Sequence, residues 1–286
     1  MRRLRISAIS FLNTAPLMWD FEHPATADPR LQEAFEFSYT VPSQCARQLS
    51  EGSADIGIIP SITYATIPGL AVLPDVAIAS KNAVRSILLV LRKPIDQVRT
   101  VALDTSSRTS VVLTKILLTK YFPGTIEREY REMPPSLENM LASCDAALLI
   151  GDAALQVDRD RYQALDLAEE WHRLTGKPFV FAFWAVRFAS LSEAGSAYDL
   201  GEVFSRSRDH GLEPASLALI AREWAPRLKM TEAAVHDYLT KNIHYTLDSE
   251  NSEGLDLFYR YAAEMHLIPE APSLRLLGAT SFRLYR

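Results

Sequence analysis

Cysteines and long apolar runs are scarce in this sequence. Its 286 residues include two cysteines, Cys45 and Cys144, and neither forms a CxxC pair or stands at metal-ligand spacing from a histidine. No run of eighteen apolar residues occurs, and a transmembrane helix needs such a run. A disulfide scaffold, a cysteine–histidine zinc site and a membrane span are therefore not expected. Both thiols are expected to be reduced and partly buried.

Short nucleotide-binding and hydrolase motifs are also absent. The sequence contains no GxGxxG, GxxxxGK[ST] or GxSxG, so nucleotide use and hydrolysis at a nucleophile elbow have no support. The six histidines show no HExxH spacing, and a metal site is not expected. The net charge of −5 disfavours nucleic acid and anionic membranes as partners, because an acidic surface attracts neither.

What the sequence does contain is typical of a globular protein, with 48% hydrophobic and 23% charged residues. Residues 1–19 begin with basic side chains, but Ser7, Ser10 and Asn13 interrupt the apolar run. No small-residue cleavage site follows, so this segment predicts a first strand and not a signal peptide. We expect a cytoplasmic protein.

Strand-like and helix-like segments alternate over the first two thirds of the chain. The predicted strands are residues 4–11, 35–39, 54–59, 72–79, 86–91, 101–103, 127–130, 146–150 and 179–186. After Ser192 the pattern turns helical, with predicted helices at residues 194–209, 214–224, 231–245 and 252–265. This order indicates an α/β protein with a helical C-terminal region.

The same order predicts two lobes joined by two crossings of the chain, near residues 86–92 and 180–187. Residues 1–90 and 186–286 are expected to form a discontinuous lobe I with the helical tail, and residues 91–185 to form lobe II. Ligands commonly bind in the cleft between such lobes, where strand ends gather. We therefore expect the functional site at this cleft.

A hydroxyl-rich turn separates the strand at 101–103 from a predicted helix. It has five hydroxyl side chains in six positions, namely Thr105, Ser106, Ser107, Thr109 and Ser110. A helix start has unpaired N–H groups and the positive end of the helix dipole, so it favours a small anion. The turn is predicted to bind a ligand carboxylate or phosphate, while the plainer interpretation is that one hydroxyl is an ordinary N-cap.

Other polar residues at predicted strand ends are candidates for the same site. Asn13 and Ser61 each stand at a predicted helix start, where either helix capping or ligand binding would explain them. Ser86 lies at the first crossing, where its hydroxyl would face the cleft. The neighbouring Arg85 would pair either with a substrate carboxylate or with a surface acid.

Three further candidates lie on later predicted strands. Gly151 and Asp152 follow the strand at 146–150. Asp152 would either transfer a proton or stabilise a helix start. Trp184 lies in an apolar strand, where aromatic side chains usually belong to the core, but its ring is also suited to forming a wall against a planar ligand.

Several longer segments together resemble the chorismate dehydratase family. They are ISFLNTAPL at 9–17, CARQLSEGSADIGIIPSITY at 45–64, RSILLVLRKP at 85–94, VALDTSSRTSVVL at 101–113, DAALLIGDAAL at 145–155, DLAEEWHRLTGKPFVFAFW at 166–184 and NIHYTLDSENSEGLDLFYRYA at 242–262. The likeness spans nearly the whole chain. It implies a fold similar to type 2 periplasmic binding proteins and no metal or organic cofactor. It also implies dehydration of chorismate to 3-[(1-carboxyvinyl)oxy]benzoate in the futalosine route to menaquinone.

The resemblance implies roles for individual residues. The family's central asparagine matches Asn13, its hinge serine matches Ser86, and its hydroxyl motif matches the turn at 106–110. The turn is expected to bind one carboxylate, while Asn13 and Ser86 orient the reacting side. The proton acceptor is either the substrate's own enolpyruvyl carboxylate, as suggested for the family, or Asp152. One departure is Ala168, where the family often has Gly, and we expect it to affect a turn and not the chemistry.

Two other functions are compatible with this sequence. A non-catalytic binding protein for a small carboxylate would share the two-lobed form, but the lack of an export signal disfavours it. The related 1,4-dihydroxy-6-naphthoate synthase of the same pathway shares the fold, but the sequence follows the dehydratase segments more closely. We expect chorismate as the small-molecule partner and a monomer or homodimer.

Overall fold

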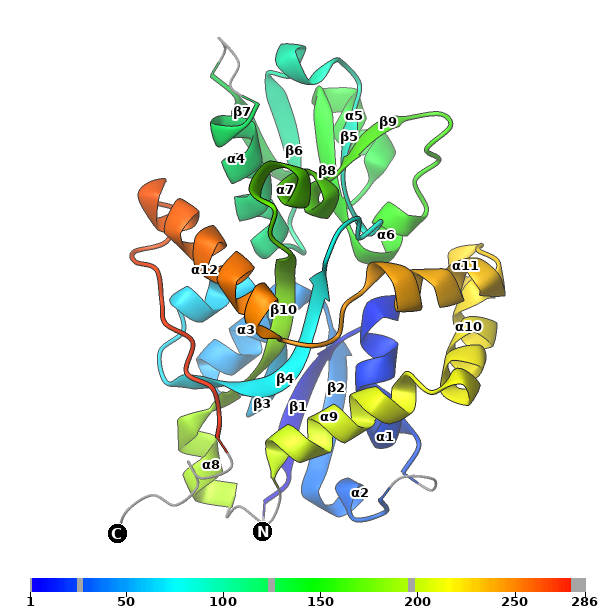
Figure 1. Cartoon of the computed structure of the whole chain (residues 1–286), viewed down its shortest axis with the longest axis vertical. Helices are drawn as coiled ribbons and strands as arrows, with labels where there is room; N and C mark the ends of the chain where they lie inside the picture. Colours follow the sequence, from blue (N-terminus) through cyan, green and yellow to red (C-terminus); the bar gives the residue numbers. More distant parts are fainter. Residues whose placement is uncertain (1, 25–27, 123–126, 195–198, 279–286) are drawn as a thin grey trace.

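The computed structural model describes residues 2–24, 28–122, 127–194 and 199–278, which contain two five-stranded sheets (Figure 1). The first sheet occupies the lower half of the view and the second the upper half, with helices packed around both. This is the two-lobed α/β arrangement that the sequence predicts. Within the described ranges, no helix is long and apolar enough to cross a membrane.

The first sheet has the strand order β2-β1-β3-β10-β4. Its strands are β1 (Leu4–Ile9), β2 (Phe35–Thr40), β3 (Ile56–Pro60), β4 (Leu70–Ser80) and β10 (Phe179–Arg187). β2 and β3 run parallel to β1, whereas β10 runs antiparallel to both β3 and β4. The helices between these strands are η1 (Leu12–Met18), α1 (Trp19–Glu22), α2 (Leu31–Ala34), α3 (Pro42–Glu51) and η2 (Ser61–Ala65).

The second sheet has the strand order β7-β6-β8-β5-β9. Its strands are β5 (Ile87–Leu91), β6 (Thr100–Asp104), β7 (Glu129–Met133), β8 (Ala146–Ile150) and β9 (Gln163–Asp166). β6 is parallel to β7 and β8, and β5 is antiparallel to β8 and β9. Its helices are η3 (Ile95–Gln97), α4 (Thr109–Lys120), α5 (Leu137–Ser143), α6 (Gly151–Leu155) and α7 (Leu167–Thr175).

Strand pairing bears on where the chain crosses between the lobes. The strand at 87–91, which a boundary at residue 90 assigns to lobe I, pairs with β8 and β9 of the second sheet. The strand at 179–187, mostly assigned to lobe II, pairs with β3 and β4 of the first sheet. Both strands are strongly apolar, so their sequence does not reveal which sheet they join. We propose lobe boundaries within the connections at residues 81–86 and 167–178.

The C-terminal region is mainly helical, as predicted, and packs largely on the first lobe (Figure 1). Its helices are α8 (Phe188–Ala194), α9 (Leu200–Gly211), α10 (Pro214–Leu228), α11 (Glu232–Asp237), the π-helical turn η4 (Tyr238–Asn242) and α12 (Ser249–Glu264). The expected helix at 194–209 includes residues 195–198, which lie outside the described residues. The expected helix at 231–245 ends at Asn242, after which His244 forms a bridge with Ala79 of β4.

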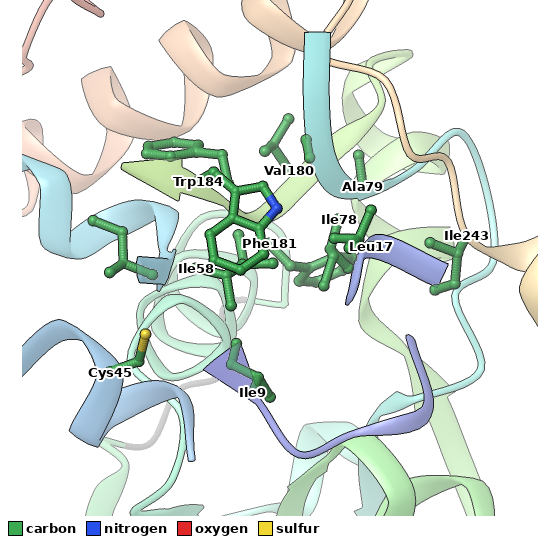
Figure 2. Close-up of a cluster of buried hydrophobic side chains, with 14 of the residues drawn as sticks. Ile9, Leu17, Cys45, Ile58, Ile78, Ala79, Val180, Phe181, Trp184 and Ile243 are labelled. Carbon is green, nitrogen blue, oxygen red and sulfur yellow. The ribbon is translucent and has the colours of Figure 1, made fainter. Parts of the chain in front are cut away.

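Both cysteines are free, as predicted, and both are fully buried where partial burial is expected. The Cys45 thiol donates to the carbonyl of Ser7 at 3.0 Å, and burial raises its pKa to about 12. Figure 2 shows Cys45 at the margin of the buried cluster that surrounds the central strands of the first sheet. The thiol is therefore a core side chain and not a nucleophile.

Candidate functional site

A small cavity lies between the two lobes, and residues of both lobes line it. Its volume is about 50 Å³. The lining residues are Ile9, Phe11, Asn13, Pro42, Pro60, Ile78, Phe181 and Ala182 from the first lobe and Ile87, Ser107, Thr109, Ser110, Ile150 and Gly151 from the second. Its polar side chains carry no formal charge, and the rest of the wall is apolar. Such a wall is suited to a ligand that is both charged and partly apolar. Neutral hydrogen-bond donors bind the charged group of the ligand, and apolar side chains contact the ligand's carbon skeleton.

The hydroxyl-rich turn forms part of this wall at the start of α4. The Ser107 hydroxyl accepts a hydrogen bond from Ser110 N at 3.2 Å and so closes the first turn of the helix. Thr109 Oγ1 accepts a hydrogen bond from Ile62 N at 3.3 Å and lies 3.4 Å from Ser61 Oγ. Because Ile62 and Ser61 belong to the first lobe, the two lobes touch directly at this edge of the cavity.

Ser106 has a different role from its neighbours in the turn. Its amide and its hydroxyl both donate to Asp104 Oδ1, at 2.8 Å and 2.6 Å, and it does not line the cavity. Asp104 Oδ2 accepts a hydrogen bond from Ile150 N at 3.3 Å. Burial raises the pKa of Asp104, and these hydrogen bonds partly offset that effect. Asp104 therefore connects the turn to β8. Of the residues expected to bind an anion, Ser107, Thr109 and Ser110 are the ones that line the cavity.

Asn13 lines the cavity from η1, and the opposite lobe holds the start of this short helix. The main-chain N–H of Leu12 donates to Asp152 Oδ1 at 3.1 Å. Burial raises the pKa of Asp152 to about 6, and the hydrogen bond from Leu12 limits the rise. Asp152 itself does not line the cavity, whereas its neighbour Gly151 does. Of the two roles expected for Asp152, the geometry thus favours holding a helix start.

Ser86 is fully buried beside the cavity and does not form its wall. Its carbonyl accepts a hydrogen bond from Gly151 N at 2.8 Å, and its hydroxyl accepts one from Tyr238 Oη at 2.9 Å. Tyr238 was not a candidate from the sequence. It lies in a helical segment where a buried tyrosine is ordinarily a core residue, so no local pattern distinguishes it.

Three residues predicted to contact substrate do not line the cavity. The Arg85 side chain is exposed, and its main chain is held in a left-handed conformation (φ 65°) by a hydrogen bond to Asp166. Ser61 Oγ donates to the carbonyl of Val180 at 2.8 Å. Trp184 is fully buried, with its ring centroid 4.8 Å from that of Phe204.

Two aromatic side chains line the cavity, Phe11 and Phe181, and Phe181 lies three positions before Trp184 on β10. Figure 2 shows the Trp184 ring in the buried cluster that also contains Ile58 and Phe181. The pairing of β10 with β4 is irregular between Val180 and Ala182 and again between Phe183 and Ala185. Simple alternation along the strand therefore does not predict which ring faces the ligand.

No group of three or more histidine, cysteine, aspartate or glutamate side chains is placed to hold a metal ion in the part of the chain that the structure describes. The polar side chains that line the cavity are the hydroxyls of Ser107, Thr109 and Ser110 and the amide of Asn13. These are groups that hydrogen-bond an anion.

Comparison with solved structures shows the fold. A protein from Archaeoglobus fulgidus superposes with a TM-score of 0.70 at 16% identity, covering 93% of this chain and 98% of that one. The periplasmic aliphatic sulphonate binding protein of Escherichia coli superposes with a TM-score of 0.65 at 15% identity, covering 96% of each chain. A Candida albicans protein described as having the generic periplasmic binding protein fold gives 0.61 at 12% identity, covering 98% of this chain and 99% of that one.

Comparison of sequences is more specific. The chorismate dehydratase of Thermus thermophilus is 30% identical over 262 residues, which cover 84% of this chain and 90% of that protein. The model of a family described as menaquinone biosynthesis matches residues 4–264. This match includes both sheets, the hydroxyl-rich turn and η4. With the periplasmic-binding-protein-like fold and the donor-lined cavity between its lobes, this chain belongs to the menaquinone biosynthesis family.

Proposed function

We propose that this protein is a chorismate dehydratase, which converts chorismate into 3-[(1-carboxyvinyl)oxy]benzoate and water. The relative from Thermus thermophilus supports the assignment. In the structure, the observation that carries it is the cavity between the lobes, whose polar side chains are neutral donors at strand ends and at the start of α4. The proposal includes a cytoplasmic location, a small-molecule partner and a monomer or homodimer.

The chemistry requires little from the protein beyond holding the substrate. Chorismate loses the hydrogen of its ether-bearing ring carbon and the hydroxyl of the neighbouring carbon. The C–H electron pair becomes the new ring double bond, the hydroxyl leaves with the C–O pair, and the proton and the hydroxide make water. Because the ring becomes aromatic, the step is downhill. The protein contributes by fixing the two carboxylates and excluding bulk water.

Each part of the cavity has an assigned role in this proposal. The first turn of α4, with Ser107, Thr109 and Ser110, binds one substrate carboxylate through hydroxyl and main-chain donors. Asn13, on the opposite lobe, donates a hydrogen bond from its side-chain amide to the reacting side of the substrate. The apolar wall, including Phe181, packs against the ring.

The substrate's own enolpyruvyl carboxylate is the proton acceptor that we favour. Asp152 is the protein alternative, but one of its oxygens already accepts the Leu12 N–H and the residue does not line the cavity. A general base must reach the proton that it removes. Asp152 therefore supports the helix that carries Asn13 and does not act on the substrate.

The test is to add chorismate to the purified protein and detect, by ultraviolet absorbance and mass, an aromatic product lighter by one water. Asn13→Ala is expected to lower kcat/KM by about 100-fold, since a hydrogen-bond donor to the substrate is lost. Asp152→Asn keeps an acceptor for Leu12 N–H and is expected to lower it less than tenfold. Asn139→Ala, at an exposed position on α5, is the control and should match the wild type.

Two outcomes would contradict parts of the proposal. If Asp152→Asn alone abolishes turnover while chorismate binding persists, Asp152 is the base and the substrate-assisted reaction is wrong. If the wild-type protein binds chorismate but releases it unchanged, the protein is a carboxylate-binding protein. The latter is the second candidate function, which the fold shared with the sulphonate binding protein favours.

A further inference from the structure

Tyr238 connects the helical C-terminal region to a residue beside the cavity that is far away in sequence. It lies in the π-helical turn η4 and is 1% exposed. Its hydroxyl donates to Ser86 Oγ at 2.9 Å across a separation of 152 residues, and the nearby Asn13 side chain lowers the pKa of the phenol. π-Helical turns occur frequently at functional sites, where they redirect one side chain out of the regular helical register.

The main chain around Ser86 is already fixed without the tyrosine. The Asp166 carboxylate accepts the N–H groups of Val84 and Arg85, at 3.2 Å and 2.6 Å. Gly151 N donates to the Ser86 carbonyl at 2.8 Å. The tyrosine hydroxyl is therefore not needed to hold the Ser86 loop in place, and its contact concerns the direction of the Ser86 hydroxyl.

The direction of hydrogen bonding matters for what Ser86 is able to do. Burial raises the pKa of Tyr238 well above its ordinary value, so the phenol stays protonated at neutral pH and acts as a donor. A serine hydroxyl that accepts a hydrogen bond from tyrosine has its own proton available for another acceptor.

We propose that Tyr238 is a positioning residue that orients the hydroxyl of Ser86 toward the substrate. This inference rests on the proposed function, because it assigns Tyr238 to the same site and the same reaction. Tyr238 itself does not line the cavity and acts only through the Ser86 hydroxyl, to which it donates.

The test is a double-mutant cycle between Tyr238→Phe and Ser86→Ala, measured by chorismate turnover. Tyr238→Phe keeps the buried ring and removes only the hydroxyl. It is expected to lower kcat about tenfold while changing KM less than twofold, because orientation is lost and the binding donors remain. In the Ser86→Ala background, the same substitution should lower kcat less than threefold, since the group that it orients is already absent.

The matched control is Tyr245→Phe, which removes the same atom from a nearby buried tyrosine. Among the described residues, the Tyr245 hydroxyl has no hydrogen-bond partner. This variant should retain wild-type kcat and KM. Thermal unfolding midpoints of all variants separate a positioning effect from a loss of structure, and Tyr238→Phe should unfold within a few degrees of the wild type.

The outcomes separate this inference from the proposed function. Additive losses in the double variant, or a loss in Tyr238→Phe that appears mainly in KM and in the unfolding midpoint, would overturn the positioning role. If the wild type binds chorismate without converting it, the proposed function is wrong, and the same cycle measured on the dissociation constant decides whether Tyr238 orients Ser86. If the wild type neither binds nor converts chorismate, both proposals are overturned.

Discussion

The pKa values of two aspartates in this protein are shifted in opposite directions, and their hydrogen-bond partners explain the difference. Burial raises the pKa of Asp55, but hydrogen bonds from Arg5, Arg2 and Ser190 outweigh it and hold the pKa well below its usual value. Arg5 Nε lies 3.0 Å from the carboxylate. Asp152 receives one main-chain hydrogen bond, from Leu12, so burial dominates and its pKa rises to about 6.

The first prediction at this scale concerns the pH dependence of stability. The pKa of Asp152 in the folded protein lies above its unfolded value of about 3.9. The contribution of Asp152 to the free energy of unfolding is therefore greatest below pH ~4 and is lost as the pH rises to ~6. Asp152→Asn removes that loss. In urea unfolding, the variant should be more stable than the wild type by about 1–2 kcal/mol at pH 7.5 and about equal at pH 4.

Asp55→Asn provides the contrast with the opposite sign. A lowered pKa contributes stability above the unfolded pKa, and this contribution is lost as the pH falls. The variant should therefore lose about 3 kcal/mol at pH 7.5, with a smaller difference from the wild type at low pH. A difference between Asp152→Asn and the wild type that does not change with pH would show that Asp152 is not perturbed by burial.

At the scale of elements, α12 packs closely against β10 and against the loop at residues 176–178 that precedes β10 (Figure 1). The Phe258 ring packs edge-on against Phe179 and Trp171, with centroids 4.9 Å and 6.2 Å apart. Trp171 Nε1 donates to the carbonyl of Pro178 at 3.1 Å. At Gly254, a Cβ atom would lie 2.2 Å from that same carbonyl oxygen, so the helix approaches the chain as closely as glycine allows.

This approach reverses the usual effect of replacing a helical glycine. In an exposed helix, Gly→Ala stabilises by about 1 kcal/mol. Gly254→Ala should instead destabilise by about 2 kcal/mol, because the methyl group pushes α12 away from its aromatic contacts. Arg260→Ala, at an exposed position on the same helix, should change the free energy of unfolding by less than about 0.5 kcal/mol. Stabilisation of Gly254→Ala in chemical denaturation would show that this contact is not tight.

At the scale of the whole molecule, the two lobes are closed on one another. The closing hydrogen bonds are Leu12 N to Asp152 Oδ1, Ser43 N to the Ser106 carbonyl at 3.2 Å and Ile62 N to Thr109 Oγ1. The cavity volume of about 50 Å³ is well below the ~300 Å³ at which ligand pockets begin. We therefore expect the lobes to separate when substrate binds and to close again around a larger volume.

Gly151 lies at the contact that this movement must open and restore. A Cβ atom there would lie 2.7 Å from Phe11 Cδ2 in the opposite lobe, and the residue has φ +58°. Gly151→Ala is expected to hold the lobes apart and to lower kcat/KM for chorismate at least tenfold, mainly by raising KM. Steady-state kinetics measure this effect.

Gly176 supplies the matched control for that variant. It also has a positive φ, of +68°, but no atom lies within 4 Å of its Cβ position. Gly176→Ala should show the backbone penalty of about 1–3 kcal/mol in unfolding and normal kinetics. Equal kinetic losses in both variants would refute a role for the Phe11–Gly151 contact in closure.

Much of this fold could be predicted from local patterns. The strand–turn–helix at 101–118 and the predominantly helical region after residue 192 follow from hydrophobic period and turn chemistry, and the structure confirms them. The hydroxyl-rich turn lies at the start of α4, and Asn13 lines the cavity. These features are local because a helix start and a strand end are defined by a few neighbouring residues.

The sequence by itself thus determined the α/β class, the two-lobed order and the donor-rich strand ends. Only the tertiary structure decided that β5 joins the second sheet and β10 the first, and that Ser106 binds Asp104 while Ser107 lines the cavity. It also decided that Tyr238 reaches Ser86. The physical reason is that these contacts join residues far apart in the chain. They depend on strand pairing and lobe closure. Neither produces a hydrophobic periodicity that is visible in the local sequence.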